Sequence, residues 1–141
     1  MSVGIVLVSH SAQLAAGVLE VAQQMAPGVR IVAAGGMEDG GIGTSFDTIT
    51  AAVQQADDGD GDGVVLLYDL GSGYLTTETA VEFLEPELGE RVTIVDTPFV
   101  EGAVSAALTA SFGADRKAVV SAALEARTAN GPGGVRSVDE M

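Results

Sequence analysis

Short apolar runs alternate along the chain with longer stretches whose apolar residues recur every three or four positions. Four of the runs are rich in valine, isoleucine and leucine and are short enough for buried strands; they cover residues 4–8, 30–34, 64–68 and 91–95. The longer stretches have the helical period, which predicts helices over residues 11–25, 75–84, 100–112 and 116–128. A further helix, capped by Thr44 or Ser45, is predicted to carry Ile49, Val53 and Ala56.

The order of these elements predicts an α/β fold. Strands that alternate with helices imply an open, mainly parallel four-stranded sheet with helices on both faces. Right-handed crossovers place every connection from a strand to the next helix at one edge of such a sheet. Four segments therefore meet at the carboxyl ends of the strands, where we expect the active site; they cover residues 9–11, 35–45, 69–73 and 96–98.

One domain accounts for most of the chain. At 141 residues, the sequence is long enough for a single sizeable core, which we expect over residues 1–128. Residues 129–141 are rich in glycine at their start and are expected to form a flexible C-terminal tail.

The composition indicates which kinds of partner and which cellular location to expect. The formal net charge is −14, so the surface should repel nucleic acid and anionic lipid and attract a partner with a basic face. The absence of cysteine excludes disulfides and thiolate metal sites. The first residues carry no basic leader, and no apolar run has the length of a transmembrane helix, so we expect a cytoplasmic protein that does not enter a membrane.

The single histidine of the chain, His10, lies where the first predicted strand meets the first predicted helix. At such a junction, beside a helix N-terminus, α/β proteins bind anions and position reactive groups. The hydroxyls of Ser9 and Ser11 flank it in the sequence. The imidazole is therefore a nucleophile, an acid or base, or a structural polar group with satisfied hydrogen bonds, and its position alone leaves these alternatives open.

The four converging segments contain no lysine or arginine, because the six bases lie at positions 30, 91, 116, 117, 127 and 136. A nucleotide site normally balances phosphate charge with a base or a metal ion, and the usual glycine motifs for phosphate are absent. The segments therefore favour one small anion, such as a phosphoryl group carried by His10 itself. Asp69, after a predicted strand, would orient the second ring nitrogen. A role as a turn former or helix cap is as open for Asp69 and is favoured for Asp96.

Hydroxyls and backbone N–H groups of the converging segments would hold the oxygens of such a phosphoryl group. The candidates are Ser11, Gly36, Thr44, Ser45 and Ser72.

An acidic turn over residues 58–63 matches the opening of a calcium loop, with Asp69 at the twelfth position. A calcium-binding loop of this kind leads into a helix, whereas residues 64–68 have the pattern of a strand. The predicted topology also places the turn at the sheet edge opposite His10. We therefore expect no metal site, and the phosphoryl-carrier hypothesis requires no cofactor.

Several short motifs, in their order along the chain, resemble those of a known family. The matching pieces are Gly4 to Ser11 followed by Leu14-Ala15 and Gly17, then Gly35-Gly36, Gly43-Thr44-Ser45, Asp69-Leu70-Gly71-Ser72 and Pro98 to Ala103. Together they resemble the phosphotransferase subunits of the PTS-dependent dihydroxyacetone kinases (DhaM), whose domain is similar to the mannose-family enzyme IIA. The Asp-Leu-Gly-Ser piece favours the dihydroxyacetone branch over the sugar-importing one.

The resemblance implies a phosphohistidine relay of the phosphoenolpyruvate-dependent phosphotransferase system. The carrier HPr would phosphorylate His10, and phospho-His10 would rephosphorylate ADP bound in the nucleotide-binding subunit of the dihydroxyacetone kinase. The family analogy gives Asp69 the orienting role, indicates Thr44 and Ser45 as phosphate contacts, and implies a homodimer. Two alternatives remain at this point: an enzyme IIA of a mannose-type sugar permease, and a non-catalytic module that binds a small anion or a partner.

Overall fold

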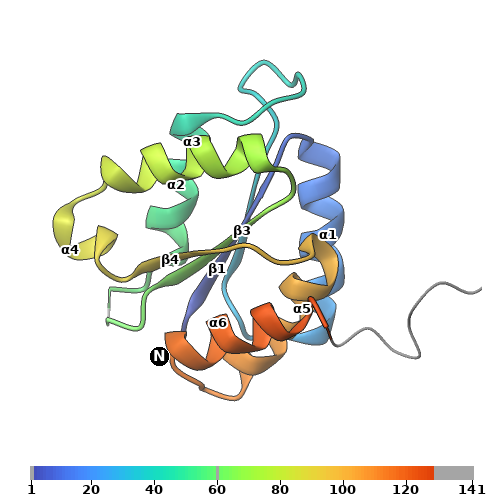
Figure 1. The fold of residues 1–141 in the computed structure, drawn as a ribbon, viewed down its shortest axis with the longest axis vertical. Coiled ribbons are helices and arrows are strands. Elements are labelled where there is room, and N and C mark those ends of the chain that lie inside the picture. The colour runs from blue at the N-terminus through green and yellow to red at the C-terminus, as the bar shows by residue number, and fades with distance from the viewer. Residues whose placement is uncertain (1, 60, 129–141) are drawn as a thin grey trace, which may run out of the picture.

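Four parallel strands form the sheet of the computed structural model, which describes residues 2–59 and 61–128 (Figure 1). The strands are β1 (Gly4–Ser9), β2 (Ile31–Gly35), β3 (Val64–Tyr68) and β4 (Val92–Val95), in the order β2-β1-β3-β4. The helices are α1 (Ala12–Met25), α2 (Phe46–Ala56), α3 (Gly71–Glu82), α4 (Pro86–Gly89), α5 (Phe99–Ser111) and α6 (Arg116–Glu125). The predicted α/β class and parallel pairing are confirmed.

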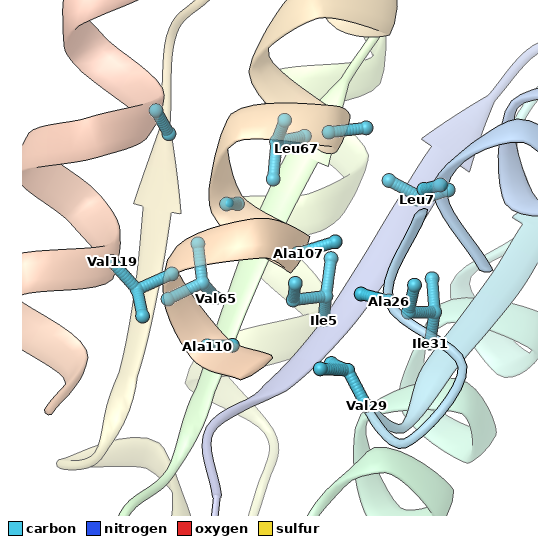
Figure 2. Close-up of a cluster of buried hydrophobic side chains, with 14 of the residues drawn as sticks. Ile5, Leu7, Ala26, Val29, Ile31, Val65, Leu67, Ala107, Ala110 and Val119 are labelled. Carbon is cyan, nitrogen blue, oxygen red and sulfur yellow. The ribbon is translucent and has the colours of Figure 1, made fainter. Parts of the chain in front are cut away.

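Two apolar layers enclose the sheet, because successive side chains of a strand point to opposite faces. Ile5 and Leu7 of β1 lie in the layer covered by α1, α5 and α6, whereas Val6 and Val8 lie in the layer covered by α2 and α3. Figure 2 shows the first layer, in which small side chains such as Ala107 of α5 let the helix pack closely on the sheet. Helices therefore cover both faces, as predicted, and β1 lies buried at the centre.

Two glycines at the end of β2 bring the following loop against the start of α1. A side chain at Gly35 would meet the backbone oxygen of Ser11 at 2.6 Å. Gly36 has a φ of 75°, which other residues rarely adopt, and its N–H donates to the carbonyl oxygen of Ser9. The loop therefore folds back beside His10, whose carbonyl oxygen accepts the N–H of Gly43 at 2.8 Å.

Helix α3 differs most from its prediction. It begins at Gly71, so the predicted start at residue 75 is wrong. Gly71 and Gly73 have poor helix propensity, so the sequence pattern does not indicate this start. In the structure only Asp69 and Leu70 separate the helix from β3. The short helix α4 has no counterpart in the prediction, and α6 ends before the predicted residue 128. The other boundaries agree within one residue.

The acidic turn predicted over residues 58–63, of which residue 60 lies outside the described residues, is at the edge opposite His10. The carbonyl oxygen of Gly63 accepts the N–H of Gly4 at the amino end of β1, and strand β3 follows directly, as predicted. The predicted C-terminal tail, residues 129–141, lies outside the described residues. Within the described part of the chain, every helix is too short or too polar to cross a membrane.

Candidate functional site

His10 lies at the carboxyl end of β1, immediately before the residue that caps α1. Ser11 provides this cap, since its hydroxyl oxygen accepts the N–H of Leu14 at 3.1 Å. The cap fixes where the strand ends and the helix begins, so His10 is held at the edge of the sheet. Its side chain is 18% exposed, which places the ring at the surface rather than in the core.

Asp69, directly after β3, supplies a carboxylate that accepts four hydrogen bonds. Its Oδ1 accepts hydrogen bonds from ring nitrogen Nδ1 of His10 at 2.9 Å and from the N–H of Leu70 at 2.8 Å. Its Oδ2 accepts the hydroxyl of Ser9 at 2.9 Å and the backbone N–H of His10 at 3.1 Å. A carboxylate offers about four acceptor positions, so Asp69 is fully engaged, and three of its four donors come from Ser9 and His10.

These hydrogen bonds favour the ionised form of the Asp69 carboxyl group. Burial raises the pKa of Asp69, but the hydrogen bonds from the His10 ring, the His10 N–H and the Ser9 hydroxyl outweigh burial and leave that pKa below its usual value. An ionised carboxylate only accepts hydrogen bonds, so Nδ1 of His10 carries the proton between them. In the neutral ring, the opposite nitrogen Nε2 then has a lone pair. This nitrogen accepts a hydrogen bond from the hydroxyl of Ser72 at 2.6 Å.

Ser72 lies in the first turn of α3, and this helix start has no side-chain cap. Helices α1, α2 and α6 are capped by the side chains of Ser11, Ser45 and Asp115, whereas α4 and α5 lack a side-chain cap as α3 does. Within this turn of α3 the N–H of Gly73 donates to the carbonyl oxygen of Leu70 at 2.8 Å, whereas no side chain caps the N–H groups of Gly71 and Ser72 before it. A helix start attracts negative charge, so this arrangement suits an anion attached to Nε2. Because the sequence predicted a helix start at residue 75, it did not indicate that Ser72 lies in the first turn of this helix.

Thr44 lies near the ring, but its hydroxyl is engaged elsewhere. A Cβ atom at Gly73 would stand 3.4 Å from Cε1 of His10 and 3.7 Å from the methyl group of Thr44, which places the three residues together. The Thr44 hydroxyl donates to that of Thr76 at 2.8 Å and so joins the loop after β2 to α3.

The remaining predicted phosphate contacts have structural partners. Ser45 is buried, caps α2 through the N–H of Thr48 and donates to the carboxylate of Glu38 at 3.2 Å. The N–H of Gly36 and the hydroxyl of Ser11 are engaged in the turn and the cap described above. Among the five predicted contacts, Ser72 alone is hydrogen-bonded to the His10 ring.

Asp96, after β4, belongs to a neighbouring cluster. Its carboxylate accepts a hydrogen bond from Nη2 of Arg127 at 3.1 Å, and both side chains are largely exposed. Burial, followed by the charge of Asp96, raises the pKa of Tyr68 at the end of β3. Arg127 follows α6, far from these loops in the sequence, so the strand–loop pattern gave no signal for a base at this edge.

Comparisons with known proteins identify a family that matches most of the chain. The sequence profile described as PTS system fructose IIA component matches residues 4–120. A protein of Listeria innocua, named PEP-dependent dihydroxyacetone kinase 1, phosphoryl donor subunit DhaM, is 41% identical over 104 residues, or 74% of this chain and 78% of the relative. A crystal structure of a protein of unknown function, EF1359, matches with a TM-score of 0.77 at 33% identity and covers 88% of this chain and 94% of that one.

Relatives of this kind differ in length. A Pantoea ananatis protein, named PEP-dependent dihydroxyacetone kinase, phosphoryl donor subunit DhaM, is 38% identical over 131 residues. The match covers 90% of this chain but only 27% of that relative. The chain therefore corresponds to most of some relatives and to one segment of others.

Proposed function

The chain belongs to the PTS system fructose IIA component family, and we propose that it is the phosphoryl donor subunit of a PEP-dependent dihydroxyacetone kinase. Its curated relatives carry that subunit name, which favours dihydroxyacetone over an imported sugar as the destination of the phosphoryl group. The observation that carries the proposal is the contact of 2.9 Å between Nδ1 of His10 and Asp69, because it makes Nε2 the nucleophile.

In the accepting step, Nε2 of His10 attacks the phosphorus of a phosphohistidine on the donor. The Nε2–P bond forms as the N–P bond of the donor breaks, and the donor ring recovers its lone pair. Nδ1 keeps its proton, and the Asp69 carboxylate stabilises the positive charge that develops on the ring. The Ser72 hydroxyl turns from Nε2 to a phosphoryl oxygen, beside the uncapped N–H groups of α3.

In the donating step, an oxygen of the terminal phosphate of ADP attacks the phosphorus on His10. The Nε2–P bond breaks, ATP forms, and Nε2 regains its lone pair. ADP is held by the nucleotide-binding kinase subunit, which must approach the exposed side of the ring. The loops around His10 contribute no lysine or arginine, which suits a phosphoryl group in transit rather than a resident nucleotide, and the chemistry requires no cofactor.

In this role the chain has two proposed partners besides the kinase subunits, HPr and a second copy of itself. HPr is the donor, and the net charge of −14 supports an encounter with a carrier that has a basic face. The protein acts in the cytoplasm as a homodimer. Light scattering after size-exclusion chromatography would give the mass of two chains, and the mass of one chain would contradict the homodimer while leaving the relay intact.

Reconstitution tests the relay. The wild-type protein and His10→Ala are each incubated with phosphoenolpyruvate, enzyme I and HPr, and intact-protein mass spectrometry follows the added mass. We expect one acid-labile phosphoryl group on the wild type and none on His10→Ala. Equal labelling of the two proteins, or none on either, would contradict the proposal. Addition of the two other kinase subunits with ADP and dihydroxyacetone should then discharge the labelled protein.

A further inference from the structure

Ser9 is a buried polar residue at the end of an apolar strand. Its side chain is fully buried, and the five residues before it in β1 are apolar or glycine. Its hydroxyl donates to Oδ2 of Asp69 at 2.9 Å and accepts the backbone N–H of Ser11 at 3.0 Å. The hydroxyl therefore joins the start of α1 to the carboxylate that holds His10.

The two oxygens of Asp69 have separate tasks. Oδ1 faces Nδ1 of His10, whereas Oδ2 is fixed by the Ser9 hydroxyl and by the His10 N–H. Contacts on both oxygens prevent the carboxylate from rotating, and rotation would move Oδ1 out of line with Nδ1. A buried hydroxyl is unfavourable unless it is hydrogen-bonded, and here its one proton is directed to this carboxylate.

We infer that Ser9 is a positioning residue for phosphoryl transfer, which acts through Asp69 to keep the proton on Nδ1 and the lone pair on Nε2 of His10. Ser9 does not touch the ring nitrogens itself. This inference rests on the proposed function, because the tautomer matters only if Nε2 accepts the phosphoryl group. A purely structural serine would affect the folded fraction but not the tautomer of His10 in the folded protein.

The test compares Ser9→Ala with Thr97→Val. Thr97 is a matched control, since it is also a buried hydroxyl at the carboxyl edge but donates to the backbone oxygen of Ala123. Ring nitrogen NMR of the single histidine reports the tautomer at neutral pH, and single-turnover labelling by phosphorylated HPr reports the rate. We expect Ser9→Ala to populate both tautomers and to slow labelling by about tenfold or more, because a hydrogen bond to a charged group is lost. Thr97→Val should keep the wild-type tautomer and rate.

A double-mutant cycle tests whether Ser9 acts through Asp69. In the Asp69→Asn background, Ser9→Ala should change the labelling rate by less than twofold. Additive losses, or a wild-type tautomer and rate in Ser9→Ala, would overturn the inference. If Ser9→Ala fails to fold, Ser9→Cys fills the same space with a weaker donor and takes the same measurements. Failure of the relay itself is distinguishable, since wild-type protein would then acquire no phosphoryl group on His10.

Discussion

At the scale of single residues, the site depends on one carboxylate that is hydrogen-bonded on both oxygens. Asp69 receives ring and backbone donors from His10 and the hydroxyl of Ser9, and this fixes which ring nitrogen keeps its proton. Asp69 and Ser72 contact the two ring nitrogens of His10 from opposite sides. His10 and Asp69 are 59 residues apart in the sequence, so the parallel sheet brings them together.

Replacement of the charge of Asp69 tests its role in transfer. Asp69→Asn keeps the size of the side chain but cannot stabilise positive charge on the ring, so labelling of His10 should slow by about 10²- to 10⁴-fold. Quenched single-turnover mass spectrometry gives the rate. Asp96→Asn is the control, because Asp96 pairs with Arg127 and should leave the rate within about twofold of wild type. A wild-type rate in Asp69→Asn would show that Asp69 is only a turn residue.

The lowered pKa of Asp69 also predicts a pH dependence of stability. The pKa is lower in the folded protein than in the unfolded chain, where it is about 3.9. The ionised form therefore stabilises the fold fully above the unfolded value, and this contribution is lost as pH falls through the lower folded value. Free energies of unfolding at a series of pH values should show the advantage of wild type over Asp69→Asn shrinking in acid. An advantage that grows as pH falls would be the opposite of this expectation.

At the scale of elements, the starts of α1, α2 and α3 have different roles at the carboxyl edge of the sheet. Ser11 and Ser45 cap α1 and α2, whereas α3 starts without a side-chain cap beside His10. The sequence offers a hydroxyl near each of these starts, and it does not distinguish a cap from a phosphate contact. That distinction depends on where each helix begins, and the glycines around Ser72 obscure the start of α3.

A matched pair of serine variants separates the two tasks. Ser45→Ala removes a helix cap and should lower the free energy of unfolding by about 1 kcal/mol while leaving the labelling rate nearly unchanged. Ser72→Ala removes an exposed hydroxyl that bonds Nε2, so it should leave stability within about 0.5 kcal/mol and slow labelling. Chemical denaturation and single-turnover labelling measure both quantities. The reverse pattern would assign the phosphate contact to Ser45.

At the scale of the whole molecule, the sequence predicts a parallel sheet between two layers of helices, and it predicts which segments meet at the carboxyl ends of the strands. Strong apolar periodicity and the right-handed crossover leave few alternatives. Periodicity does not specify the order of the strands, although the pairing of β1 with β3 creates the contact between His10 and Asp69. Arg127, which follows α6, illustrates the limit: it reaches Asp96 because α6 packs against α5, beside β3 and β4. Such contacts depend on tertiary packing rather than on local sequence.

The net charge of −14 also belongs to this scale, since it acts on encounters rather than on the chemical step. Labelling by a donor with a basic face should slow by roughly tenfold as salt rises from about 50 to 500 mM, because screening weakens long-range attraction. The second-order rate constant of labelling measures this effect, and circular dichroism at each salt concentration controls for folding. A rate that is independent of salt would mean that the acidic surface does not guide the donor.

The nitrogen that carries the phosphoryl group is the central question, and the single histidine makes it directly measurable. Protein labelled with ¹⁵N in the histidine ring is phosphorylated with phosphoenolpyruvate, enzyme I and HPr, and its ring nitrogen signals are recorded before and after. Coupling to phosphorus is expected on Nε2, with Nδ1 still protonated beside Asp69. Phosphorus coupling on Nδ1, or ring signals that do not change on phosphorylation, would contradict the assignment of His10 Nε2 as the phosphoryl carrier.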